Sequence, residues 1–164
     1  MSAICGCAVE AVETETPGPP CDLSLDPAAD AIVTDAERLR QALINLLANA
    51  RQALAGSAVA AATGHASPTA WPERGVIRLA SAFGQGGRVT ISVRDRGPGI
   101  EADRLSRIFD PYFTTKRTGT GIGLAITRNI VEGLGGVIHV RSRVGEGTEV
   151  TIELPRTSPG VVAE

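Results

Sequence analysis

The chain has 164 residues, enough for one domain with a hydrophobic core, and 43% of them are hydrophobic, which argues against a disordered tail. The formal net charge is −2, from 16 basic and 18 acidic residues, so neither a nucleic acid nor an anionic membrane is an expected partner. No apolar run approaches the roughly 20 residues that span a bilayer. The N-terminus has no basic start followed by an apolar stretch, so it does not resemble a signal peptide.

The first 20 residues are predicted to be a leader or linker without regular structure. Residues 17–20 read Pro-Gly-Pro-Pro, a sequence that breaks helices and strands. The expected domain then covers residues 21–156, and residues 157–164 are expected to form a C-terminal tail.

Three cysteines, Cys5, Cys7 and Cys21, lie near the N-terminus. An odd number is a poor disulfide framework, and the Cys5–Cys7 pair has no second pair at metal-ligand spacing. We therefore expect structural or incidental cysteines in a protein of the reducing cytoplasm.

From residue 21 onward, hydrophobic alternation, helical periodicity and breaker residues divide the chain into elements. In the first half of the chain we expect short strands around 23–25 and 31–33, and then a helix from Thr34 or Asp35 to about Ala55, which Gly56 stops. A loop over 56–75 and two strands, over 76–83 and 88–94, are expected to follow. In the second half we expect a short helix near 101–108, a Thr/Gly-rich stretch over 110–120, a helix from about Ile122 to Gly135, and strands over 137–142 and 149–154. Because strands follow strands, the order predicts an α+β fold, a two-layer sandwich with a mixed, mostly antiparallel sheet and helices on one face.

The glycine clusters do not match the usual nucleotide loops. A P-loop requires a Gly-Lys pair, which the chain lacks, and the spacing of Gly119, Gly121 and Gly123 is not that of a dinucleotide fingerprint.

One glycine cluster, residues 95–99, follows a predicted strand and reads Asp-Arg-Gly-Pro-Gly. Gly97 and Gly99 permit a tight turn and a close approach of the backbone to a ligand, with the carboxylate of Asp95 at the base of the turn. A plain strand-to-helix turn accounts for the same residues.

A second cluster, residues 119–124, runs directly into a predicted helix. Free N–H groups at a helix start suit a phosphate, and Lys116 and Arg117 add positive charge. An ordinary flexible surface loop is the alternative.

Asn45 and Asn49 stand four residues apart on one helical face, where two amide oxygens could meet a hard cation such as Mg²⁺. A solvated polar face is the alternative. None of these segments decides the function alone, but their joint order along the chain is informative.

That order resembles the ATP-binding catalytic domain of sensor histidine kinases, within the GHKL superfamily that includes DNA gyrase, Hsp90 and MutL and shares the Bergerat fold. The resemblance covers about residues 21–155 and rests on an N box at 45–50 (Asn-Leu-Leu-Ala-Asn-Ala), a G1 box at 95–100, an F box at 107–116, a G2 box at 119–124 and a closing glycine motif at 145–148. The Phe-Thr-Thr-Lys ending of the F box resembles the nitrogen-regulatory and dicarboxylate-sensing branch.

The resemblance implies roles for individual residues. Asn49 would hold the Mg²⁺ that bridges the phosphates, and Asp95 would accept a hydrogen bond from the adenine 6-amino group. Residues 110–120 would form an ATP lid, with Phe109 and Phe113 as its hydrophobic anchors. Asn45 and Lys116 would be the catalytic residues. The other implied ATP contacts are Gln52, Gly97, Gly99, Ile100, Phe109, Phe113, Thr115, Lys116, Arg117, Gly119, Thr120, Gly121, Ile122, Gly123, Leu124 and Thr148.

The chain differs from many members of the superfamily at two positions, and both differences bear on the expected activity. Many relatives carry Lys or Arg where this chain has Gln52, while Arg51 points off the amide face, so Lys116 is expected to compensate more of the phosphate charge. The superfamily's ATPases place a water-activating Glu where this chain has Asn45, and an amide cannot act as that general base. The sequence therefore predicts a kinase rather than a hydrolase.

The acceptor histidine is expected on a separate dimerisation domain, with a response regulator downstream, because neither His65 nor His139 stands in the family's acceptor motif. We expect a monomer that binds Mg-ATP without phosphorylating itself, in the cytoplasm and without membrane contact. The acceptor domain is expected either in the same full-length protein, of which this chain is then a fragment, or on another chain. A larger protein of this kind can be a membrane-bound sensor. The alternatives are a partner-sequestering module like the anti-sigma-factor serine kinases, or a non-catalytic nucleotide sensor of the same fold.

Overall fold

The computed structural model describes residues 1–15, 18–30, 32–62, 76–114 and 121–159. Their centre is a five-stranded sheet of order β1-β2-β3-β5-β4, built from β1 (Cys21–Leu25), β2 (Ile77–Phe83), β3 (Arg88–Asp95), β4 (Val137–Arg143) and β5 (Gly147–Pro155). β1 pairs with β2 in parallel, and the other three pairings are antiparallel. The predicted mixed, mostly antiparallel sheet is confirmed.

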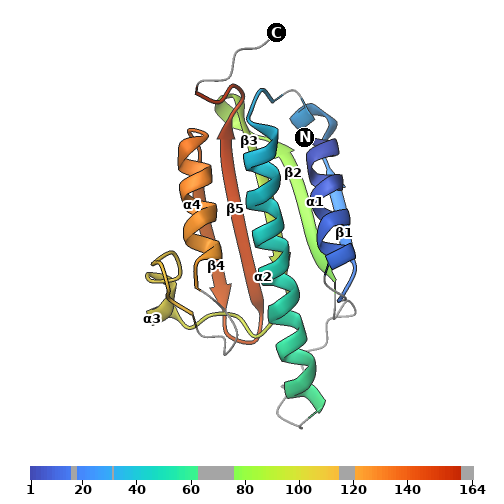
Figure 1. Cartoon of the computed structure of the whole chain (residues 1–164), viewed down its shortest axis with the longest axis vertical. Coiled ribbons are helices and arrows are strands. Elements are labelled where there is room, and N and C mark those ends of the chain that lie inside the picture. The colour runs from blue at the N-terminus through green and yellow to red at the C-terminus, as the bar shows by residue number, and fades with distance from the viewer. Residues whose placement is uncertain (16–17, 31, 63–75, 115–120, 160–164) are drawn as a thin grey trace.

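Three helices, α1 (Ser2–Glu15), α2 (Ala36–Ala62) and α4 (Gly123–Gly133), lie over the same face of the sheet (Figure 1). The single-turn α3 (Ala102–Leu105) stands apart at one end, beside α4 and β4, and is shorter than predicted. Short 3₁₀ turns, η1 (Pro27–Asp30) and η2 (Gln85–Gly87), complete the fold. The predicted two-layer α+β sandwich is confirmed. None of the helices within the described residues is long and apolar enough to cross a membrane.

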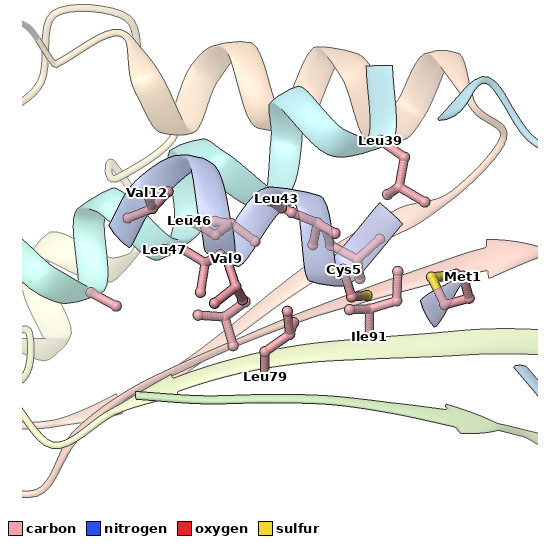
Figure 2. Packing of buried hydrophobic residues seen from close by; sticks show 14 of the residues in the cluster. Met1, Cys5, Val9, Val12, Leu39, Leu43, Leu46, Leu47, Leu79 and Ile91 are labelled. Atoms are coloured by element: carbon pink, nitrogen blue, oxygen red, sulfur yellow. The ribbon is translucent and has the colours of Figure 1, made fainter. Parts of the chain in front are cut away.

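The core lies between the sheet and these helices, as strand alternation and helical periodicity predicted. Alternate residues of β3, among them Val89 and Ile91, are almost fully buried and face α2. Leu39, Leu43 and Leu47 of α2 meet them at helical spacing and are fully buried (Figure 2). Each such side chain contributes about 1.5–3 kcal/mol of burial free energy, so the sheet fixes the rotation of α2 about its axis.

The prediction of an irregular leader is wrong for residues 2–15, because they form α1. Cys5, Ala8, Val9 and Val12, spaced at i, i+3, i+4 and i+7, face the core and are buried (Figure 2). The Pro-Gly-Pro-Pro run follows the helix and ends it instead of preventing it. All three cysteines of the chain are free thiols, and Cys5 is a core residue.

Two boundaries around α2 also differ from the prediction. Of the strand predicted over 31–33, the described residues 32–33 show an isolated bridge from Val33 to Thr157 and no strand; η1 ends just before them, and residue 31 lies outside the described residues. α2 continues through Gly56 to Ala62, so the predicted loop is wrong over 56–62; residues 63–75 lie outside the description. One glycine costs a helix about 1 kcal/mol, and the alanine-rich run after it favours the helix. At the other end, Asp35 accepts the Arg38 N–H and caps the helix as predicted.

Candidate functional site

A cavity of about 570 Å³ opens between α2, the ends of β3 and β5, and the start of α4. Its volume lies in the range of small-molecule sites. The predicted site residues that line it are Asn45, Asn49, Gln52, Asp95, Gly99, Ile100, Phe113, Gly121, Gly123, Leu124 and Thr148. The structure thus brings together residues from all five motifs of the sequence.

Asp95 ends β3 at the floor of the cavity and is only 7% exposed. It continues the buried face of the strand, because Val89, Ile91 and Val93 alternate ahead of it. Its Oδ1 accepts the backbone N–H of Gly97 at 2.8 Å, which holds the carboxylate at the base of the following turn. A buried carboxylate in a mainly apolar cavity is a strong acceptor for a ligand's N–H group.

Of the two glycines after Asp95, Gly97 packs against Ala53 of α2 and Gly99 packs against the β4–β5 hairpin. Gly99 has φ of 72°, and a Cβ there would lie 2.5 Å from the carbonyl carbon of Arg143. Gly147 of the hairpin has φ of 107°, and a Cβ added there would likewise overlap the backbone of Asp95 and Arg96. These close approaches exclude side chains. Gly97 itself does not line the cavity, so its contribution is the turn and the bond to Asp95.

Thr148 lines the cavity directly opposite Asp95, its partner in the β3–β5 register. Its hydroxyl lies 2.9 Å from that of Ser142, which also accepts the Ile100 N–H at 2.9 Å and bonds the Gly147 carbonyl at 2.8 Å. Sequence reasoning missed Ser142. Its position two residues after Val140, on the same face of β4, is the signal that could have found it.

The wall contributed by α2 carries amides. Asn45, Asn49 and Gln52 line the cavity, and Gln41 donates a long 3.5 Å hydrogen bond to the Asn45 oxygen. Arg51 does not line it and is buried on the α1 side, so the expectation that it points away is confirmed. The Asn49 amide lies 3.8 Å from the point where a Cβ on Gly123 would stand, so it sits beside the start of α4.

The start of α4 is open to an anion. Its N-cap residue, Ile122, makes no side-chain capping bond, and the first turn, fully within the described residues, carries no acidic side chain. Such a terminus presents N–H groups and a positive dipole end. Gly121, with φ of 67°, packs against the backbone of Tyr112 and Phe113 and accepts the Tyr112 N–H at 3.0 Å. Ile122 is not among the lining residues.

The two predicted lid anchors occupy different surroundings. Phe113 lines the cavity, and the Arg107 guanidinium lies 4.8 Å from its ring centroid. Phe109 does not line it; the guanidinium of Arg128 lies 5.8 Å from its ring. A hydrogen bond to Glu132 raises the pKa of Arg128 above its ordinary value, so the residue remains a cation.

Several predicted residues cannot be placed. Thr115, Lys116, Arg117, Gly119 and Thr120 lie outside the described residues, and their roles stay predictions.

Sequence reasoning also missed most of the apolar lining. These residues are Leu46, Ala48, Ala50, Ala53, Val93, Pro98, Ile108, Val140 and Val150. Strand alternation marks the valines as facing the helices, but a sequence pattern does not distinguish a cavity wall from packed core.

The model for histidine kinase-, DNA gyrase B- and HSP90-like ATPases matches residues 34–158, most of the chain. The chain belongs to this family. It is therefore an ATP-binding domain, as the motifs predicted. The matched residues run from just before α2 to just beyond β5, so this family domain contains the whole cavity lining, while α1 and β1 lie outside the match.

The curated relatives of this ATPase-family domain are sensor kinases. The sensor histidine kinase ZraS of Escherichia coli is 45% identical over 124 residues, which are 76% of this chain and 23% of ZraS. The kinase AtoS of the same organism is 36% identical over 136 residues, 83% of this chain and 20% of AtoS. The two-component sensor PprA of Pseudomonas aeruginosa is 36% identical over 156 residues, 94% of this chain and 15% of PprA. The chain spans at most about a quarter of the length of these relatives.

Solved structures agree on the fold. The catalytic domain of the histidine kinase ThkA superposes with a TM-score of 0.72 at 30% identity, covering 96% of this chain and 93% of that one. A mycobacterial sensor histidine kinase, MprB, gives the same TM-score at 22% identity, with coverage of 94% and 95%. The second likeness supports the fold alone.

Proposed function

We propose that the chain is the catalytic domain of a two-component sensor histidine kinase. It binds Mg-ATP in the cavity and donates the γ-phosphate to a histidine on a separate dimerisation domain, for relay to a response regulator. The observation that carries the proposal is the buried Asp95 carboxylate at the floor of a cavity whose other wall is the open start of α4. The two features suit opposite ends of one nucleotide.

The hydrogen-bond acceptors of the Asp95 carboxylate favour adenine as the base. A carboxylate has two oxygens with two lone pairs each, so Asp95 can accept both the Gly97 N–H and the 6-amino group of adenine. Guanine presents an acceptor oxygen at that position, which a carboxylate repels. Thr148, held by Ser142, adds a hydroxyl beside the same base.

The phosphate end is served by the α4 start and by Asn49, which lies beside it. The amide oxygen of Asn49 is a hard donor of the kind that Mg²⁺ prefers, so the residue fits the ion; Mg²⁺, when bound, neutralises phosphate charge during transfer. Asn45 replaces the carboxylate that would activate water, which preserves ATP for the histidine. Lys116 is proposed to add positive charge from the lid.

Self-phosphorylation is not part of the proposal. His139 lies on β4, with its Nε2 3.8 Å from the Glu153 carboxylate, and not on a helix. His65 lies outside the described residues. Because its proposed cosubstrate is ATP and its three thiols are free, we place the domain in the cytoplasm.

The test is a nucleotide titration with Mg²⁺ on the wild type and on Asp95→Asn. The single oxygen of Asn must serve either the Gly97 N–H or adenine, so ATP affinity should fall at least about tenfold, as expected for a lost bond to a charged acceptor. Asp103→Asn, an exposed site on α3, is the matched control. Equal affinity of the wild type for ATP and GTP, or an unchanged ATP affinity in Asp95→Asn, contradicts the proposal.

Transfer is tested by adding a histidine-containing dimerisation domain and Mg-ATP. Acid-labile phosphate on the added histidine supports the kinase. Phosphoserine on an added partner, or binding without transfer, would instead support the serine kinase or the nucleotide sensor.

A further inference from the structure

An arginine occupies an interior position on the helix that carries the amides. Arg51 is only 3% exposed, and arginine is almost never buried at this level unless it is paired. It stands between Asn49 and Gln52 in sequence, both of which line the cavity. At 100° per residue its side chain leaves α2 on the side opposite Asn49, where α1 packs (Figures 1 and 2).

The contacts of Arg51 join three elements. One guanidinium nitrogen donates to the Val12 carbonyl of α1 at 3.4 Å, and another to the Glu13 carboxylate of α1 at 3.4 Å. The same Glu13 oxygen accepts the backbone N–H of Cys21, the first residue of β1, at 3.3 Å. Burial raises the pKa of the Cys21 thiol, and the nearby Arg51 side chain partly counteracts that rise.

The backbone at Gly18, between α1 and β1, packs against the aliphatic part of the Arg51 side chain, with a Cβ there 3.5 Å from its Cδ. Arg51, in the middle of α2, therefore contacts the end of α1 and the backbone at Gly18, and through Glu13 it is connected to the start of β1.

This arrangement makes the position of α2 depend on α1. Loss of Glu13 alone would leave a buried cation without its carboxylate, which is strongly unfavourable. Undocking of α1 would remove the bonds of Arg51 to Val12 and Glu13 together, so the turn of α2 that carries Arg51 would lose its polar contacts with α1. Because Asn49 belongs to the same helical turn as Arg51, its position relative to the start of α4 becomes less tightly fixed in either case.

We propose that Arg51 is a positioning residue that couples the docking of α1 to the nucleotide site. The proposal rests on the proposed function, since the coupled ligand is Mg-ATP. It goes beyond that function because α1 lies outside the family match at residues 34–158.

Coupling is reciprocal, so ATP must also favour docking of α1. Hydrogen exchange is measured on the whole chain with and without saturating Mg-ATP, for the wild type, Arg51→Met and Glu13→Gln. Arg40→Met is the matched control, because Arg40 lies on α2 and, within the described part of the chain, forms its ion pair inside the helix, with Glu37. Met keeps the length of the Arg51 stem without its charge.

In the wild type and the control, Mg-ATP should slow exchange both in the cavity segments and in α1, in the latter by about fivefold, the low end of typical coupling factors. In Arg51→Met and Glu13→Gln the cavity should still be protected, but the effect on α1 should vanish. The affinity of both variants for Mg-ATP, measured well below their melting temperatures, should fall about fivefold or more. Glu13 is 42% exposed, so Glu13→Gln keeps the test available if Arg51→Met does not fold.

The outcomes separate the two proposals. If Mg-ATP protects neither region of the wild type, both the proposed function and the coupling are refuted. If it protects the cavity but not α1, or protects α1 equally in the two variants, only the coupling is refuted. A lower melting temperature with unchanged affinity and unchanged α1 protection would show a purely structural arginine.

Discussion

Replacing Gly99 by alanine tests whether the turn after Asp95 and the β4–β5 hairpin are locked together. Gly99 has φ of 72°, and an added Cβ would lie 2.5 Å from the Arg143 carbonyl carbon and 2.9 Å from the Val144 nitrogen. Gly145, in the turn that follows, has φ of 82° and nothing within 4 Å of an added Cβ. The two glycines share the backbone conformation and differ in the space around them, so Gly145→Ala is the matched control.

The expected magnitudes follow from this difference. A left-handed backbone conformation costs a non-glycine residue about 1–2 kcal/mol, so the unfolding free energy of both variants falls by that amount. In Gly99→Ala the hairpin must also retreat by roughly 1 Å, an overpacking that costs about 1–3 kcal/mol. The retreat breaks the 2.8 Å bond from the Gly145 N–H to the Pro98 carbonyl, about 1 kcal/mol more. Gly99→Ala should therefore lose about 2–4 kcal/mol more unfolding free energy than Gly145→Ala.

Urea unfolding at equilibrium measures both values, and titration with ATP on the folded variants measures the effect on the cavity. Gly99→Ala should weaken ATP binding because the turn carries Asp95 and Ile100, whereas Gly145→Ala should leave it near wild type. Equal destabilisation by the two alanines would refute the claim that Gly99 is required by close packing.

Two further predictions concern titration and reactivity. Hydrogen bonds from the backbone N–H groups of Phe83 and Ala28 hold the pKa of Asp26 below its ordinary value of 3.8, so its contribution is present above that pH and is lost as the pH falls through the lowered pKa. Asp26→Asn should accordingly flatten the fall in melting temperature below about pH 4, and an unchanged acid profile would contradict this. Burial raises the pKa of the Cys5 thiol to about 11, whereas Cys7 is exposed. At pH 8, iodoacetamide should label Cys7 and spare Cys5 until urea unfolds the protein, as mass spectrometry of the peptides would show.

Much of the sheet and of the site could be predicted from the sequence, because both rest on local patterns. Alternation located all five strands to within about two residues, and the glycine motifs identified positions where the structure requires positive φ, such as Gly99 and Gly121. The Asn45–Asn49 spacing placed both amides on one wall of the cavity. In each case the signal lies within a few neighbouring residues.

The errors arose where tertiary contacts decide the structure. The apolar stripe of α1 consists of small residues, Cys5, Ala8, Val9 and Val12, and the prolines after it carried more weight in the prediction. Its stability comes from packing on α2, which no local pattern shows. Ser142 acquires its role only when β4, β5 and the turn before Ile100 meet.

The pairing of Asp95 with Thr148 puts the proposed binding site at the junction between two hairpins, β2–β3 and β4–β5. Each hairpin closes a short loop, whereas joining β3 to β5 must close a loop that contains both α3 and α4. A chain in which β3 and β5 have not yet paired therefore cannot present the Asp95 carboxylate and the Thr148 hydroxyl side by side. At the proposed site, nucleotide retention would therefore report that the long-range pairing of β3 with β5 is complete.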